Sequence, residues 1–191
     1  MRYIGKLTKA FGGGPVFATA DVRRLFRSAS RAYVDLMLHN LARAKRLFRL
    51  AKGVYSFHGD AQLVGFAFPP FYYGCEDALS LHGLWEQETN TVVITPRKVR
   101  SGTRKFDGTN YLVRRICRKM FFGYETMKCG EFWVPVSTVE KTLIDLVYFR
   151  VHIPKEVLAG LRKRIDKKRL AELLAKCPSK LKKRVNRNYA K

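Results

Sequence analysis

The 191-residue sequence predicts an α+β fold in which helices and a β-hairpin come first, a mixed α/β part follows, and basic helices close the chain. Three observations predict it. Apolar residues recur at helical spacing through the first 43 residues, β-branched and aromatic runs separated by glycines fill the middle, and helical periodicity with dense Lys and Arg returns after Pro154. With 47% hydrophobic residues, the chain has enough apolar side chains to bury real cores.

A domain boundary is predicted near Pro69-Pro70, where an irregular linker over residues 58–68 ends and the charge balance changes. We expect a first domain over residues 1–60 and a second over residues 68–191. The second is predicted to be mixed α/β to about residue 150, with basic helices over 154–190.

The formal net charge of +23 is concentrated at the two ends of the chain. Residues 1–58 carry +10, residues 59–149 carry only +1 and residues 150–191 carry +12. This distribution indicates a nearly neutral packed middle between two surfaces that face anions. It favours nucleic acid as the partner over a charge that serves only solubility.

Several classes of protein are disfavoured by the sequence. No stretch reaches the roughly 18 to 20 apolar residues of a membrane span, and no apolar signal segment follows the first basic residues. We therefore expect a cytoplasmic protein with no membrane partner. Cys75, Cys117, Cys129 and Cys177 lack metal-ligand spacing, and no catalytic triad or nucleotide-binding glycine loop is recognisable, so we expect no metal, no cofactor and no enzymatic activity.

Three helices are predicted in the first 43 residues, each with apolar residues three or four positions apart. The first ends at the glycine run over residues 12–14. The second begins near Thr19 or Asp21, either of which can cap it, and turns its arginines outward. The third begins after Ser30, a good N-cap, and runs to about Arg43.

Two short alternating runs, Arg46–Leu50 and Val54–Phe57, flank a turn that contains Gly53, which predicts a β-hairpin. Two short helices, a Ser-rich turn, a longer third helix and this hairpin together predict a winged helix-turn-helix. In that arrangement the third helix enters the major groove of duplex DNA with its N-terminal end first.

The third helix offers Arg31, Tyr33 and Asn40 as candidates for contact with base edges, since Arg suits guanine and Asn suits adenine. Asp35 is expected to sit off the phosphate backbone, which would repel it. The basic side chains of the second helix and the hairpin are expected to touch phosphates. The DNA-binding residues predicted in this domain are Arg23, Arg24, Arg27, Ser30, Arg31, Tyr33, His39, Asn40, Arg43, Lys45, Arg46, Arg49 and Lys52.

The middle of the chain is predicted to alternate helix and strand. A helical pattern spans Cys75–Trp85, and Ser137–Glu140 has the pattern of a capping box that opens a helix from Val139 to Phe149. Lys141 and Asp145 in that helix are spaced as an i,i+4 ion pair. The predicted strands are Thr91–Thr95, Tyr111–Ile116, Lys119–Glu125 and Glu131–Val136.

Four short segments occur in the order Lys52–Tyr55, Ala78–Leu84, Phe121–Gly123 and Val136–Leu146. Together they resemble the AbiE-type antitoxin regulators of type IV toxin–antitoxin systems, over roughly residues 15 to 150. The resemblance implies an N-terminal winged helix that binds inverted repeats in its own promoter and represses its operon. It also implies a C-terminal domain that neutralises a nucleotidyltransferase-like toxin. The residues that it assigns to the promoter are Arg31, Tyr33, Asn40, Arg43 and the hairpin.

His82 lies within one of these segments, and we expect it to be a hydrogen-bonded structural residue rather than a ligand or an acid–base group. The long, very basic C-terminus departs from the family. Three basic amphipathic helices are predicted there, the last of them starting at Pro178. Duplex DNA is the first partner expected for them, an acidic protein the second and anionic lipid the third. Their predicted DNA-binding residues are Lys163, Arg164, Lys167, Lys168, Arg169, Lys182, Lys183 and Arg184.

The sequence-based interpretation is thus a non-enzymatic antitoxin that binds promoter DNA and represses its own operon, with the C-terminal helices adding phosphate contacts on the same duplex. Two alternatives remain open. One is an interaction protein that neutralises a nucleotidyltransferase toxin by direct binding, and the other is an RNA-binding factor.

Overall fold

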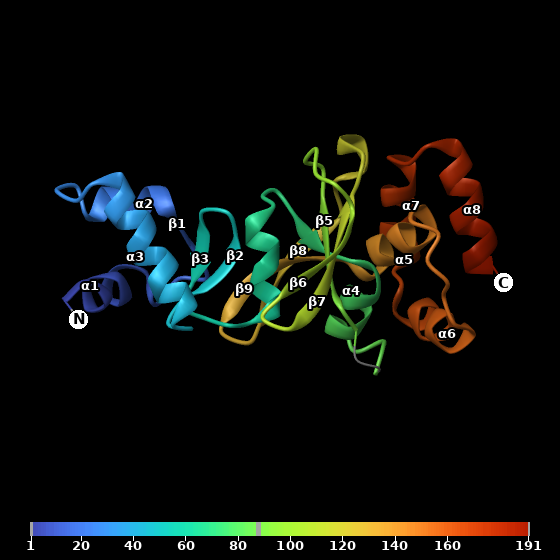
Figure 1. Cartoon of the computed structure of the whole chain (residues 1–191). Coiled ribbons are helices and arrows are strands. Elements are labelled where there is room, and N and C mark those ends of the chain that lie inside the picture. The colour runs from blue at the N-terminus through green and yellow to red at the C-terminus, as the bar shows by residue number, and fades with distance from the viewer. Residues whose placement is uncertain (1, 87–88, 191) are drawn as a thin grey trace. The chain divides into compact units, whose positions relative to one another are not determined.

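The computed structural model describes residues 2–86 and 89–190 and divides into two compact units (Figure 1). The first unit holds the residues up to Ala67 together with Lys105–Thr109. The second holds Phe68–Arg104 and the residues from Asn110 onward. Both contain helices and strands, so the expected mixed α+β architecture is confirmed.

The first unit combines helices with a small antiparallel sheet. Its elements in chain order are α1 (Arg2–Phe11), β1 (Phe17–Ala18), α2 (Thr19–Leu25), α3 (Arg31–Arg43), β2 (Phe48–Ala51), β3 (Val54–Ser56) and the 3-10 helix η1 (Ala61–Ala67). The three strands are arranged in the order β1-β3-β2. Leu7 of α1, Val22 of α2 and Val34 and Leu38 of α3 are fully buried in one core with Phe17 and Tyr55 of the sheet. The predicted helices and hairpin are therefore confirmed.

The predicted irregular linker over residues 58–68 is wrong for residues 61–67, which form η1. Asp60 begins it, because its carboxylate accepts a hydrogen bond from the backbone N–H of Gln62 at 2.8 Å. Leu63 and Val64 are then fully buried. The polar residues and glycine at the start of this segment, residues 58–62, favoured the prediction of a linker over that of a helical turn.

The second unit holds a six-stranded mixed sheet of order β6-β7-β5-β4-β9-β8, apart from residues Lys105–Thr109 at the β6–β7 turn, which belong to the first unit. The strands are β4 (Tyr72–Tyr73), β5 (Thr91–Thr95), β6 (Gly102–Phe106), β7 (Thr109–Arg115), β8 (Tyr124–Cys129) and β9 (Phe132–Ser137). Its helices are α4 (Cys75–Leu81), η2 (Arg118–Met120), α5 (Val139–Tyr148), α6 (Lys155–Arg164), α7 (Lys167–Ala175) and α8 (Ser179–Ala190). Strands β5 and β7 run parallel, as do β4 and β9.

Helix α5 is the centre of the core of this unit. Eight of its residues are buried, and it contacts α4, α6, α7 and α8 (Figure 1). The core also takes in Val92 and Ile94 of β5 and Leu161, Leu174 and Val185 of the C-terminal helices. The three predicted basic helices are thus confirmed as amphipathic elements that bury their apolar faces against α5.

Two local predictions in this unit are wrong. Residues 119–123 do not form a strand, because η2 and a turn at Gly123, with φ of +72°, precede β8. The predicted capping box is also absent. Thr138 is the N-cap of α5 and accepts from the backbone N–H of Lys141, while Ser137 ends β9. The Glu140 carboxylate accepts instead from the backbone N–H of Asp166, 26 residues further on, at 3.0 Å.

The described part of the chain contains no helix that is long and apolar enough to cross a membrane.

Candidate nucleic-acid interface

Helix α3 is held with one face in the core and the other in solvent. The Ser30 hydroxyl accepts a hydrogen bond from the backbone N–H of Tyr33 at 3.2 Å, which confirms the predicted N-cap and fixes where the helix begins. Val34 and Leu38 anchor the buried face. The five residues 26–30 separate α3 from α2, which gives a short connection between two packed helices.

The exposed side of α3 carries most of the predicted base-reading residues. Arg31, His39, Asn40 and Arg43 are all exposed, and Leu36 between them is 58% exposed. The surface is therefore mixed in character, with cations, an amide and an apolar side chain. This is a combination that can reach guanine, adenine and the thymine methyl group in a major groove.

Tyr33 lies on the side of α3 that faces α1. Its ring meets the ring of Tyr3 edge to face, with centroids 5.6 Å apart. A hydrogen bond with the Tyr3 side chain raises the pKa of Tyr33 above its ordinary value. Tyr33 is thus partly committed to α1, although 41% of it remains exposed.

The predicted phosphate-binding arginines of α2 differ in what they contact. Arg23 donates to both carboxylate oxygens of Asp35 at 2.8 Å, and Arg24 lies 3.5 Å from a carboxylate oxygen of Asp21. Arg27 is exposed beyond the end of α2. Asp35, expected to sit off the phosphates, forms an ion pair with Arg23, so this pair contributes less positive potential than the sequence indicates.

The hairpin β2–β3 presents a basic tip. Lys52 is exposed there, next to Gly53, whose φ of +79° requires glycine in the turn. The Gly53 carbonyl accepts from the backbone N–H of Thr19 at 2.9 Å, which ties the hairpin to the start of α2. Arg49 on β2 and the preceding Lys45 and Arg46 are also exposed.

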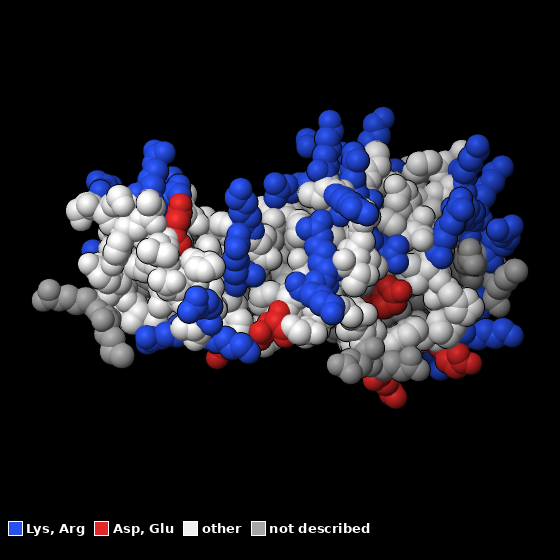
Figure 2. All heavy atoms as spheres, viewed as in Figure 1, with Lys and Arg blue, Asp and Glu red and all other residues white. Residues whose placement is uncertain are grey.

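The predicted DNA-binding residues of the C-terminal helices fall into two groups, lysines that lie at the surface and arginines that bond to the protein itself. Lys163, Lys167, Lys168 and Lys183 are exposed, and Lys182 is half-buried. Arg184 donates to the carbonyl of Val147 at 2.7 Å, and Arg164 donates to the carbonyl of His82. Figure 2 shows that Lys and Arg side chains gather over α7 and α8.

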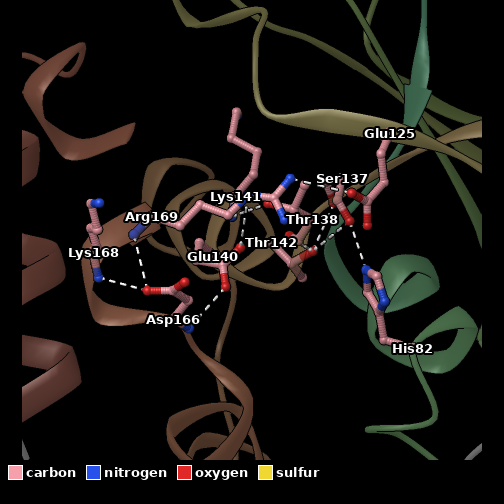
Figure 3. A network of polar contacts seen from close by, with 10 residues as sticks. All are labelled: His82, Glu125, Ser137, Thr138, Glu140, Lys141, Thr142, Asp166, Lys168 and Arg169. Atoms are coloured by element: carbon pink, nitrogen blue, oxygen red, sulfur yellow. Dashed lines mark hydrogen bonds and ion pairs between the residues drawn. The ribbon is translucent and has the colours of Figure 1, made fainter. Parts of the chain in front are cut away.

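Arg169 at the start of α7 is held by two carboxylates (Figure 3). Its guanidinium lies 3.2 Å from Glu125 of β8 and 3.8 Å from Glu140 of α5. Asp166 caps the same helix by accepting from the backbone N–H groups of Lys168 and Arg169. These contacts tie α7 to the sheet and to α5, which gives Arg169 a structural role.

The polar residues of the family-like segment around α5 are also structural. Lys141 and Asp145 form an ion pair with both side chains 0% exposed, and the hydroxyl of Tyr72 bonds to both of them at 2.9 Å. Burial raises the pKa of Asp145, while Lys141 and Tyr72 act to lower it. His82 Nε2 lies 2.7 Å from the carbonyl oxygen of Ser137, as expected of a structural histidine (Figure 3).

One group of cations in the second unit was not predicted from the sequence. Arg97, Lys98, Arg115 and Arg118 line an open hollow at the end of β5 and β7, together with Cys117 and Tyr148. We call it the basic hollow. The middle of the chain has a net charge of only +1, so the segment average hid this local excess. The pattern that could have predicted it is that basic residues lie at or directly after the ends of two strands rich in β-branched residues.

No group of His, Cys, Asp or Glu that could hold a metal ion occurs among the described residues. The fold and the surface charges together define the class: a two-unit α+β protein whose exposed cations cluster on helix α3, a hairpin, the C-terminal helices and the basic hollow.

Comparison with known proteins gives a structural match. No protein-family model matches the sequence, and no curated protein matches it. The chain is similar in fold to the crystal structure of the RV2827C protein from Mycobacterium tuberculosis, with a TM-score of 0.67 and 13% sequence identity. The match covers 100% of this chain and 77% of that one. At this identity the likeness concerns the fold alone.

Proposed function

We propose that the protein is a sequence-specific binder of double-stranded DNA and that its first unit is a winged helix-turn-helix. The observation that carries the proposal is the local geometry of α2, the short turn, and α3. Helix α3 is capped, anchored by Val34 and Leu38, and exposed at Arg31, Asn40 and Arg43. The basic hairpin β2–β3 supplies the wing.

In this proposal α3 enters the major groove with Arg31 leading. Arg31 and Arg43 pair with guanine, Asn40 pairs with adenine, and Leu36 packs against thymine methyl groups. Arg27, Arg49 and Lys52 contact phosphates on either side, which adds affinity without adding sequence information. Arg23 is left to hold Asp35.

The C-terminal helices add phosphate contacts through Lys163, Lys167, Lys168 and Lys183, which are exposed. Arg164, Arg169 and Arg184 contribute less, because each already bonds to a carbonyl or carboxylate of its own unit. The salt dependence of DNA binding therefore arises from fewer cations than the composition indicates.

The biological role we propose is that of an AbiE-type antitoxin in the cytoplasm that represses its own operon at inverted repeats and is not an enzyme. The resemblance of Lys52–Tyr55, Ala78–Leu84 and Val136–Leu146 to that family supports this role. The second candidate is direct neutralisation of a nucleotidyltransferase-like toxin by the second unit. Its support is the same resemblance, which lies largely in that unit.

A gel-shift competition with the full chain tests the proposal. The probe is the duplex directly upstream of the coding sequence, and the competitors are a scrambled duplex and double-stranded RNA of equal length. We expect the upstream duplex to bind about 1,000-fold more tightly than the scrambled one at physiological salt. Equal affinity for both duplexes would rule out the repressor role, and a preference for RNA would favour the RNA-binding alternative.

A further inference from the structure

The basic hollow of the second unit lies where two parallel strands end. Strands β5 and β7 pair in parallel from Thr91 with Tyr111 to Thr95 with Arg115, so their carboxyl ends meet at the same edge of the sheet. Loops that follow this edge form the usual ligand crevice of sheets with parallel neighbours. Figure 2 shows Lys and Arg side chains gathered over the second unit on the side where these loops lie.

The walls of the hollow are held by hydrogen bonds between hydroxyl groups and the backbone and within the backbone. The buried Thr95 hydroxyl lies within 3.0 Å of the carbonyls of Phe68 and Pro70, and the backbone N–H of Ile116 donates to the carbonyl of Thr95 at 3.0 Å. The backbone N–H of Arg115 donates to the Ser101 hydroxyl at 3.0 Å, which ties β7 to the loop that follows β5. These hydrogen bonds fix the backbone of the segments that carry the four cations.

The lining of the hollow has one sign of charge. Arg97, Lys98, Arg115 and Arg118 contribute four cations, and the lining includes no carboxylate among the residues that the structure describes. Four like charges around one space repel one another, and a bound polyanion offsets that repulsion. Two or more phosphate oxygens can pair with the planar guanidinium groups in a bidentate manner.

The size of the hollow and its uncharged lining residues indicate a ligand larger than a single phosphate group. Its volume is about 820 Å³, within the range typical of sites for small organic ligands. Tyr148 supplies a half-buried aromatic ring, and Ile116 supplies an apolar floor that is 1% exposed. An aromatic ring beside a cluster of cations suits a flat base joined to a phosphate chain.

We propose that the basic hollow is a binding site for nucleoside phosphates, either free or as the phosphorylated end of a nucleic-acid strand. The phosphates lie among Arg97, Lys98, Arg115 and Arg118, and the base lies against Tyr148. This site is in the second unit and is independent of DNA recognition by α3.

Cys117 gives a direct readout, because it lines the hollow and is exposed, whereas Cys75, Cys129 and Cys177 are buried. The experiment follows alkylation of Cys117 by iodoacetamide in the full native chain, using peptide mass spectrometry at constant ionic strength. Probes are ATP, GTP, a 5′-triphosphorylated oligonucleotide, adenosine and inorganic tripolyphosphate. At a concentration tenfold above Kd, a nucleoside triphosphate is expected to slow alkylation about tenfold.

The probes also separate the two sources of the ligand. Protection by ATP or GTP at lower concentration than by the oligonucleotide identifies a free nucleotide, and the reverse order identifies a strand end. Arg115→Ala combined with Arg118→Ala is expected to weaken nucleotide binding about 100-fold, since two charge-assisted contacts are lost. Lys128→Ala, an exposed lysine on β8 that lies outside the hollow and outside the proposed DNA contacts, is the matched control and is expected to leave nucleotide binding unchanged. Equal melting temperatures of the variants exclude a folding defect.

Three results would overturn the proposal. These are no protection of Cys117 by any nucleotide, protection that persists in the Arg115 and Arg118 double variant, and protection by tripolyphosphate equal to that by ATP. Loss of DNA binding in α3 variants has no bearing on these outcomes, so failure of this site and failure of the DNA-binding proposal are distinguishable.

Discussion

In the first unit the arginines of α3 and the hairpin stand exposed, whereas in the C-terminal helices of the second unit three arginines bond to their own fold. Arg31, Arg43 and Arg49 are exposed, and within the described residues their side chains take part in no hydrogen bond or ion pair. Arg169, by contrast, sits between two carboxylates. Similar net charges at the two ends of the chain therefore represent different amounts of charge available to a ligand.

The strongest case of an internally satisfied cation is Lys141. Replacing it with methionine leaves the Asp145 carboxylate buried without its counter-ion, which is expected to cost about 3 to 5 kcal/mol of the free energy of unfolding. Urea denaturation at neutral pH measures the loss. In the double variant Lys141→Met with Asp145→Leu, most of it is expected to be recovered. A Lys141→Met protein as stable as the wild type would contradict the buried ion pair.

The exposed cations of α3 are expected to affect binding and leave stability unchanged. Arg31→Ala and Arg43→Ala should each weaken binding to the upstream duplex by about 1 to 3 kcal/mol and relax sequence preference at one position. Fluorescence anisotropy with single-base variants of the duplex measures both effects. Arg23→Ala is the informative comparison, because it frees Asp35 and is expected to weaken binding through repulsion of phosphate rather than loss of a base contact.

At the tip of the hairpin, Lys52→Ala removes one proposed phosphate contact. Binding should weaken equally for the upstream and the scrambled duplex, and the slope of log Kd against log salt should fall by about one. A titration between low and physiological salt measures the slope. A change in sequence preference without a change in slope would place Lys52 at a base edge instead.

The smallest effect is expected for Arg169→Ala compared with Lys167→Ala, two cations at the start of α7. Arg169 is half-exposed, so its ion pairs with Glu125 and Glu140 are worth no more than about 1 kcal/mol of stability. Its loss should lower the melting temperature slightly and leave the salt slope unchanged. Lys167→Ala should leave the melting temperature unchanged and lower the salt slope of DNA binding. Equal effects of the two on DNA affinity would remove the distinction between bonded and exposed cations.

The sequence predicted those features that depend on local pattern. The apolar spacing around Val34 and Leu38 and the N-cap Ser30 were sufficient to place α3, and Gly53 was sufficient to place the hairpin turn. Features that depend on distant partners were not predictable in this way. Glu140 bonds to Asp166 rather than to its own helix start, and Arg169 finds Glu125 on a strand 44 residues earlier.

The basic hollow was missed for the same reason. Its cations come from two segments that only parallel pairing of β5 and β7 brings to one edge, and each segment is diluted by acidic residues elsewhere in the middle of the chain. Strands β4 and β6 were also missed, since one has two residues and the other begins at a glycine and carries two basic residues.

In the proposed mode of binding, the first unit recognises the DNA sequence and the C-terminal helices add only phosphate contacts. Two triple variants of the full chain test it, one with Arg31, Asn40 and Arg43 changed to alanine and the other with Lys163, Lys167 and Lys183 changed to alanine. The measurement is the ratio of affinities for the upstream and the scrambled duplex. We expect the ratio to collapse toward one in the first variant and to stay at the wild-type value in the second, where both affinities fall together. A ratio that collapses in the second variant and survives in the first would contradict this mode of binding.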